Sequence, residues 1–112
     1  SLGSRVATPA AITVHSVDLL DTVDSSLLPL LPNLVQIIDG ALQAGDGRVI
    51  VHCHAGVSRA PSIAAAYLIW AQQLSLDDAM AILRKHRPKS DPNVGFQRQL
   101  QEWEHTCRAA AQ

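Results

Sequence analysis

A cysteine and an arginine stand six positions apart in the stretch "VIVHCHAGVSRAPS", which covers residues 49 to 62. The stretch opens with β-branched residues typical of a strand and runs into an alanine-rich pattern typical of a helix. Cys53 and Arg59 therefore stand at the two ends of a short loop, in which Gly56 gives the backbone the freedom for a tight curve.

The loop has the chemistry of an anion site. Backbone N–H groups at the start of a helix point outward and carry partial positive charge, so a loop that leads into a helix can cradle an anion. Those amides and a nearby guanidinium both favour thiolate over thiol, which lowers the pKa of Cys53 and makes its sulfur a nucleophile at neutral pH. Arg59 can hold two oxygens of a phosphate in a fork. Together the two side chains predict attack by sulfur on a bound phosphoryl group.

The first half of the chain predicts a strand, a helix and a second strand. "AITVHSV" (11–17) alternates apolar and polar residues, and "RVIVH" (48–52) is a short apolar run typical of a strand buried in a parallel sheet. Pro29 and Pro32 are tolerated only in a first turn, so the helix between the strands begins between Ser26 and Pro32. Its apolar face is predicted to hold Leu27, Leu30, Leu31, Leu34, Ile37, Ile38, Ala41 and Leu42.

Three more helices are predicted downstream. One runs from about Ser58 to Gln73, and Ser75 with Asp78 resembles a capping box that opens a second, which Pro88 ends. Asn93 can cap the last helix, whose apolar face holds Phe96, Leu100, Trp103 and Cys107. The order of elements predicts one α/β domain over residues 1–112, with a largely parallel central sheet flanked by helices. The loop of Cys53 follows a strand, where such folds place their ligand sites.

Composition excludes several classes of partner. The net charge of −1 and the pI near 6.5 argue against a nucleic-acid partner, which would need a basic face. The longest apolar run, "AAAYLIWA", is too short to cross a membrane, and the N-terminus shows no signal-peptide pattern. Two cysteines 54 positions apart do not form a disulfide framework. We therefore expect a cytoplasmic or nuclear protein; the sequence is silent on its oligomeric state.

At these residues the chain resembles the dual-specificity group of the cysteine-dependent phosphatases. Their signature runs His-Cys, five residues, Arg, with "AGxSR" inside it, and "HCHAGVSR" satisfies it. The resemblance continues through "IIDGAL", "AAAYLIW" and "RPKSDPNVGFQRQLQEWE", so it covers about residues 12 to 105. It implies hydrolysis of phosphotyrosine and of phosphoserine or phosphothreonine on protein substrates through a phosphocysteine intermediate, without a metal or another cofactor.

The resemblance also implies a role for each matched residue. Cys53 is the expected nucleophile, and Arg59 binds the phosphate and stabilises its equatorial oxygens. The general acid is expected at Asp21, with Asp18 and Asp24 as neighbours that serve if the loop is shifted. The amides expected to line the phosphate are those of His54, Ala55, Gly56, Val57, Ser58 and Arg59.

Two departures from the family pattern stand out. The residue after the arginine is usually Ser or Thr, whose hydroxyl stabilises the departing thiolate; here it is Ala60, and Ser62, two positions on, is expected to point elsewhere. Loss of one hydrogen bond to a charged group costs about 1.5 to 3 kcal/mol, which slows a step roughly ten- to hundredfold. Family domains also usually begin with a further strand and helix, so we expect a catalytic domain shortened at its N-terminus.

Other interpretations of the same residues remain open. Ala60 favours a phosphate-binding module with weak or no turnover. A phosphatase for phosphoinositides or other non-protein phosphates is less favoured, because lipid-directed relatives commonly carry lysines in the loop, where this chain has His54 and Val57. A rhodanese-like sulfur carrier fits "AGVSR" poorly.

His52 and His54 project to opposite sides of an extended chain, which argues against a zinc site. Asp21 could also be a structural loop or cap carboxylate.

Overall fold

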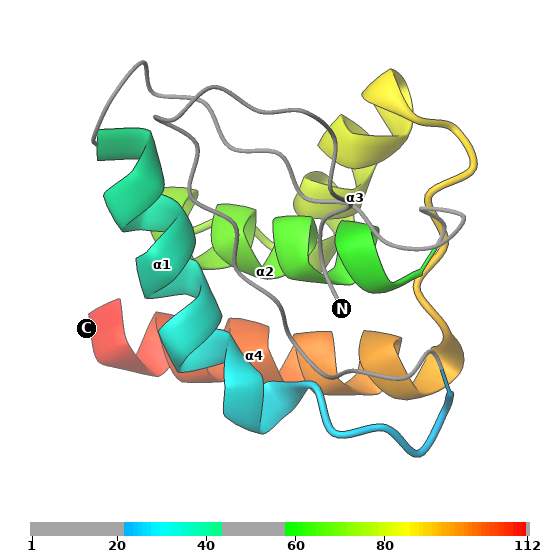
Figure 1. Ribbon diagram of the computed structural model, residues 1–112, viewed down its shortest axis with the longest axis horizontal. Helices are drawn as coiled ribbons and strands as arrows, with labels where there is room; N and C mark the ends of the chain where they lie inside the picture. Colours follow the sequence, from blue (N-terminus) through cyan, green and yellow to red (C-terminus); the bar gives the residue numbers. More distant parts are fainter. Residues whose placement is uncertain (1–21, 44–57, 112) are drawn as a thin grey trace, which may run out of the picture.

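The computed structural model describes residues 22–43 and 58–111 of the chain. Both predicted strands, at 11–17 and 48–52, lie outside these residues. The described part consists of helices joined by short segments (Figure 1). They are the 3₁₀-helix η1 (Leu28–Leu30) and the α-helices α1 (Leu31–Gln43), α2 (Arg59–Gln72), α3 (Leu76–His86) and α4 (Val94–Ala111).

The first helical segment begins where its two prolines allow. Pro29 lies in η1 and Pro32 is the second residue of α1, so neither ring interrupts an established helix. The predicted start between Ser26 and Pro32 is therefore confirmed. The predicted apolar face was wrong at Ala41, which is exposed, and it missed Val35, which is buried. The buried stripe of α1 holds Leu31, Leu34, Val35 and Ile38, and Leu42 packs against the same core.

Helix α2 is the centre of the helical part and contacts α1, α3 and α4 (Figure 1). Its bounds agree with the predicted helix from Ser58 to Gln73 to within one residue at each end. The helix can be approached closely from several sides because Ala65 and Ala66 are small, and both are fully buried. Ile63 and Ile69 fill the space between α2 and its neighbours. This burial fixes α2 among its three neighbours.

Helix α4 packs along α2 through the face that the sequence predicts. Phe96, Leu100 and Trp103 are buried, and Cys107 lies half-buried at the edge of the same core. The indole Nε1 of Trp103 donates a hydrogen bond to the backbone oxygen of Ala66 over 2.9 Å. A buried indole N–H needs such a partner, so this bond sets the position of α4 along α2.

Helix α3 is capped from its own sequence and from α4. The Ser75 hydroxyl accepts a hydrogen bond from the amide of Asp78 over 3.1 Å, which confirms the predicted N-cap. A carboxylate oxygen of Glu104 on α4 accepts from the amide of Leu76 over 2.5 Å. The helix ends at His86, two residues before Pro88. None of the helices in the described ranges is long and apolar enough to span a membrane.

Candidate active site

The described residues hold one end of the predicted loop. Ser58 and Arg59 lie where the chain enters α2. The acid candidate Asp24 is exposed in a turn just before η1. The other predicted site residues, Cys53, His54, Ala55, Gly56, Val57 and Asp21, lie outside the described residues, as does Asp18.

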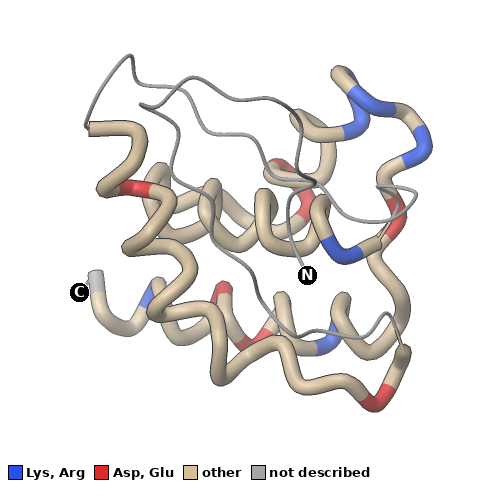
Figure 2. Tube along the Cα trace, in the orientation of Figure 1, with Lys and Arg blue, Asp and Glu red and all other residues tan. Residues whose placement is uncertain are grey.

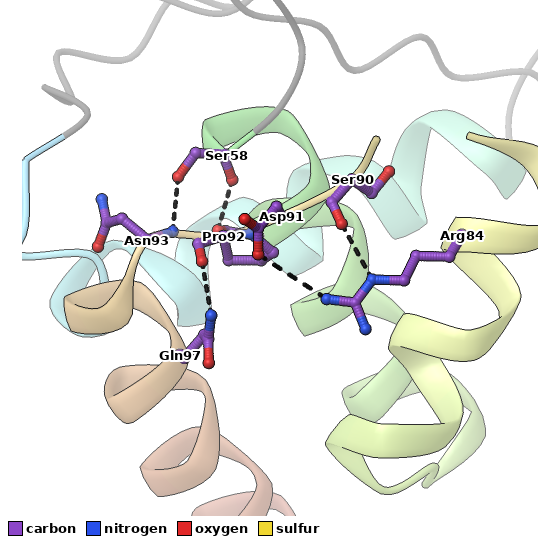
Figure 3. Close-up of polar contacts among 8 residues, drawn as sticks. Ser58, Arg84, Ser90, Asp91, Pro92, Asn93 and Gln97 are labelled. Carbon is purple, nitrogen blue, oxygen red and sulfur yellow. Dashed lines mark hydrogen bonds and ion pairs between the residues drawn. The ribbon is translucent and has the colours of Figure 1, made fainter. Parts of the chain in front are cut away.

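Ser58 is fixed from two sides although it is a loop residue. It is 4% exposed, and its hydroxyl accepts a hydrogen bond from the amide of Asn93 over 2.8 Å (Figure 3). Its side chain makes no capping bond to α2. The backbone oxygen of Ser58 accepts two bonds from Ser62, one from the amide over 3.0 Å and one from the hydroxyl over 2.6 Å. The last residue before Arg59 is therefore tied both to α2 and to the segment before α4.

That second anchor, the segment Asp91–Asn93, is itself held rigidly. The Asn93 side-chain oxygen accepts from the amide of Phe96 over 2.9 Å, which confirms Asn93 as the cap of α4. Gln97 donates from Nε2 to the backbone oxygen of Pro92 over 2.8 Å, and Pro92 is buried (Figure 3). The sequence predicted the cap. No signal in the sequence around Asn93 or Ser58 predicts the contact between them.

Arg59 stands at the positive end of a helix. It is the first residue of α2, it is half-buried, and its Nε is enclosed by the protein. The helix N-terminus carries partial positive charge, so its dipole and the guanidinium act at the same end of the element. An anion bound at this end would meet both, and a guanidinium can hold two of its oxygens at once.

Ala60 and Ser62 both lie in the first turn of α2 and are buried. Ala60 is 6% exposed, so its methyl group lies in the interior at the second position of α2. The hydroxyl of Ser62 donates its only proton to the backbone oxygen of Ser58. Ser62 is thus committed to α2, and its proton is not available to replace the hydroxyl that is missing at Ala60.

Positive charge gathers beside this region, at the end of α3 and in the segment after it (Figure 2). Arg84, Lys85 and His86 form the last turn of α3, where cations interact favourably with the helix dipole. Arg84 is part of the scaffold: its Nε donates to the backbone oxygen of Ser90 over 3.0 Å, and its Nη2 lies 3.9 Å from a carboxylate oxygen of Asp91 (Figure 3).

Two other titratable groups are poorly suited to catalysis at neutral pH. Burial raises the pKa of the Cys107 thiol, so this sulfur stays protonated and weakly nucleophilic. Burial also raises the pKa of Tyr67, and the hydrogen bond that its hydroxyl donates to Asp39 over 3.1 Å adds to the effect. Among the residues that the structure describes, no group of three or more His, Cys, Asp or Glu side chains could hold a metal ion.

Residues 5–106 match the dual specificity phosphatase catalytic domain family. The match covers most of the chain, which therefore belongs to this family. Dual specificity protein phosphatase 19 of Mus musculus is 33% identical over 92 residues, which are 82% of this chain and 41% of the relative. The chain thus spans less than half the length of this relative.

Solved structures of the same family share the fold. A mouse protein described as a dual specificity phosphatase and complexed with zinc tungstate superimposes with a TM-score of 0.80 at 34% identity, covering 83% of this chain and 58% of its own. A human tyrosine phosphatase-like serine/threonine/tyrosine-interacting protein gives 0.76 at 34% identity, covering 80% and 59%. These folds are of the α/β class, and the described residues form a helical part of such a fold.

Proposed function

We propose that this chain is a cysteine-dependent phosphatase that hydrolyses phosphotyrosine and phosphoserine or phosphothreonine on protein substrates. The observation that carries the proposal is the complete signature "HCHAGVSR" in a member of the dual specificity phosphatase family. The structure of Ser58 and Arg59 supports it, because the end of the signature is held against α2 and the segment before α4. The remaining part of the loop is proposed to follow a strand of a largely parallel sheet.

The proposed reaction has two chemical steps. In the first, the thiolate of Cys53 attacks phosphorus while the bond to the leaving oxygen breaks, and Asp21 gives its proton to that oxygen. In the second, the Asp21 carboxylate takes a proton from water, whose oxygen attacks the phosphocysteine and releases inorganic phosphate and the thiolate. Arg59 and the loop amides offset the charge on the equatorial oxygens in both steps, so these residues require no metal.

A second candidate function is phosphate binding with little or no turnover. Ala60 is buried without a hydroxyl, and Ser62 is committed to the backbone of Ser58, so the usual stabiliser of the leaving thiolate is missing. One of the relatives is named an interacting protein rather than a phosphatase. This candidate keeps the anion site and loses the second chemical step.

Steady-state turnover of 4-nitrophenyl phosphate separates these two candidates. We expect sustained release of phosphate, inhibition by vanadate, and turnover of peptides that carry phosphotyrosine and phosphothreonine. Binding of vanadate with no turnover of any substrate would support the second candidate. Turnover of a soluble phosphoinositide without turnover of phosphopeptides would move the substrate class to non-protein phosphates.

Ala60 leads to a kinetic prediction. The missing hydroxyl should slow the second step and spare the first, because attack by Cys53 does not use it, so phosphocysteine should accumulate and give a burst of product. Ala60→Ser should raise the steady rate roughly tenfold or more if a charge-assisted bond of about 1.5 kcal/mol is restored. Rapid-quench measurement of burst and steady rates on both proteins checks this.

Ser62→Ala is the matched control for that experiment. It removes a hydroxyl two positions away, while the amide of residue 62 still donates to the backbone oxygen of Ser58 and keeps it in place, so the ratio of burst to steady rate should stay unchanged. No burst in the natural sequence and no gain in Ala60→Ser would mean that another group stabilises the leaving sulfur or that an earlier step limits the rate.

A further inference from the structure

One side chain of α4 holds the segment that leads from the predicted acid region into η1. Gln99 donates from Nε2 to the backbone oxygen of Ser25 over 2.8 Å. Its Oε1 accepts from the amide of Leu27 over 2.6 Å and from the amide of Leu28 over 2.8 Å. All three bonds join residues more than 70 positions apart in the sequence. Gln99 therefore fixes the backbone of residues 25–28 on the surface of α4.

A second residue of α4, Gly95, determines how closely the same segment can approach the helix. A Cβ atom at Gly95 would lie 2.9 Å from the Cα of Val23 and would overlap its carbonyl group. Real Cβ atoms do not come so close to backbone, and the carbonyl cannot move aside as a flexible side chain could. Only glycine lets the backbone of Val23 rest on α4 here. Val23 stands beside Asp24 and two positions after Asp21.

The same end of α4 also holds the end of the predicted phosphate loop. Asn93, immediately before α4, donates its amide to the hydroxyl of Ser58. The seven residues from Asn93 to Gln99 therefore make two contacts. They contact the segment that follows the predicted acid, and they contact Ser58. A rigid helix that touches two loops fixes the distance between them.

We propose that Gly95 and Gln99 are positioning residues that set the general acid against the phosphate loop. They touch no reacting atom; they act through the backbone of residues 23–28, which continues directly into the acid region. Because the acid serves only in the phosphatase reaction, the inference rests on the proposed function. A shift of about 1 Å at a reacting group can cost on the order of a hundredfold in rate, so small changes in this contact should be measurable.

The test compares leaving groups in Gly95→Ala and Gln99→Met. Phenyl phosphate needs its leaving oxygen protonated, whereas 4-nitrophenyl phosphate needs this much less. We expect kcat/KM for phenyl phosphate to fall roughly ten- to hundredfold and that for 4-nitrophenyl phosphate by less than about threefold. Gln101→Met is the matched control, because Gln101 is exposed on the same helix. It should leave both values unchanged.

Two further variants guard against a simple folding defect. Gln99→Glu keeps an oxygen to accept from Leu27 and Leu28, so it should fold, but it replaces the donor to the backbone oxygens of Ser25 and Gly95 with a carboxylate oxygen and should show a loss of the same kind. Adding Gln99→Met to Asp21→Asn should cause no further loss on phenyl phosphate, because a displaced acid and an absent acid affect the same step. Thermal unfolding of each variant is followed in parallel.

The outcomes separate the inference from the proposed function. An active natural protein whose variants lose equal activity on both substrates, or lose none, would overturn the positioning role. Additive losses with Asp21→Asn would also overturn it. A natural protein with no turnover of either substrate would instead remove the phosphatase activity, and the positioning role with it.

Discussion

Replacement of Cys53 by serine should abolish turnover while binding of vanadate or phosphate persists. A serine hydroxyl is not ionised at neutral pH, so the attacking anion disappears, whereas the amides and Arg59 that would hold the phosphate remain. We expect a loss on the order of a thousandfold or more, as for removal of other covalent nucleophiles. Steady-state hydrolysis of 4-nitrophenyl phosphate measures the rate, and vanadate titration followed by isothermal calorimetry measures binding.

The second cysteine provides the matched control. Cys107→Ser changes the same atom on α4, where burial raises the thiol pKa and keeps the sulfur protonated. It should leave turnover within about twofold. At neutral pH iodoacetamide should alkylate Cys53 well before Cys107, and vanadate should protect Cys53. A Cys53→Ser protein that kept a tenth of the activity would rule out the covalent mechanism.

Replacement of Asp21 by asparagine should slow hydrolysis in proportion to the basicity of the leaving oxygen. General acid catalysis contributes about 10²- to 10⁴-fold where the leaving group needs a proton, so phosphoserine peptides and phenyl phosphate should lose on the order of a hundredfold or more. Activated aryl phosphates should lose far less. The values of kcat/KM for a series of aryl phosphates, plotted against the pKa of the leaving phenol, should fall more steeply for Asp21→Asn than for the natural protein.

The pH dependence of the reaction is a second, independent test of the role of Asp21. The first step needs Asp21 protonated, and kcat/KM reports this step even where breakdown of phosphocysteine limits kcat. We therefore expect kcat/KM of the natural protein to fall as the pH rises through the pKa of the acid, and this limb should be absent in Asp21→Asn. Asp24→Asn is the control, since Asp24 is exposed in the described turn. Equal losses on all leaving groups would assign Asp21 a structural role. An unchanged Asp21→Asn together with a leaving-group effect in Asp24→Asn would move the acid to Asp24; an effect in neither would move it to Asp18.

Much of the helical architecture could be predicted because its signals are local. Pro29 and Pro32 restrict where a helix can begin, Ser75 and Asn93 cap helices within three residues of themselves, and the apolar spacing of α4 repeats every turn. The buried face of α1 was predicted less well. Val35 and Ala41 are both apolar, so which of them is covered depends on the elements that α1 packs against, such as α2.

The candidate site likewise has one part that the sequence predicts and another that depends on the tertiary structure. The types and spacing of Cys53 and Arg59 are enough by themselves to predict a chemistry, because a thiolate, a guanidinium and a helix start would act together within one short loop. The sequence also predicted that the hydroxyl of Ser62 would point elsewhere, but the structure was needed to show that it bonds to the backbone oxygen of Ser58, four residues before it.

Only the tertiary structure decided what holds Ser58 and the segment before η1 in place. Ser58 meets Asn93 across 35 positions, and Gln99 meets Ser25 across 74. A serine, an asparagine or a glutamine can bond to almost any backbone group, so its partner depends on which elements packing brings together and not on its neighbours in the sequence. The need for glycine at position 95 arises likewise from the backbone of Val23, which reaches α4 only in the folded chain.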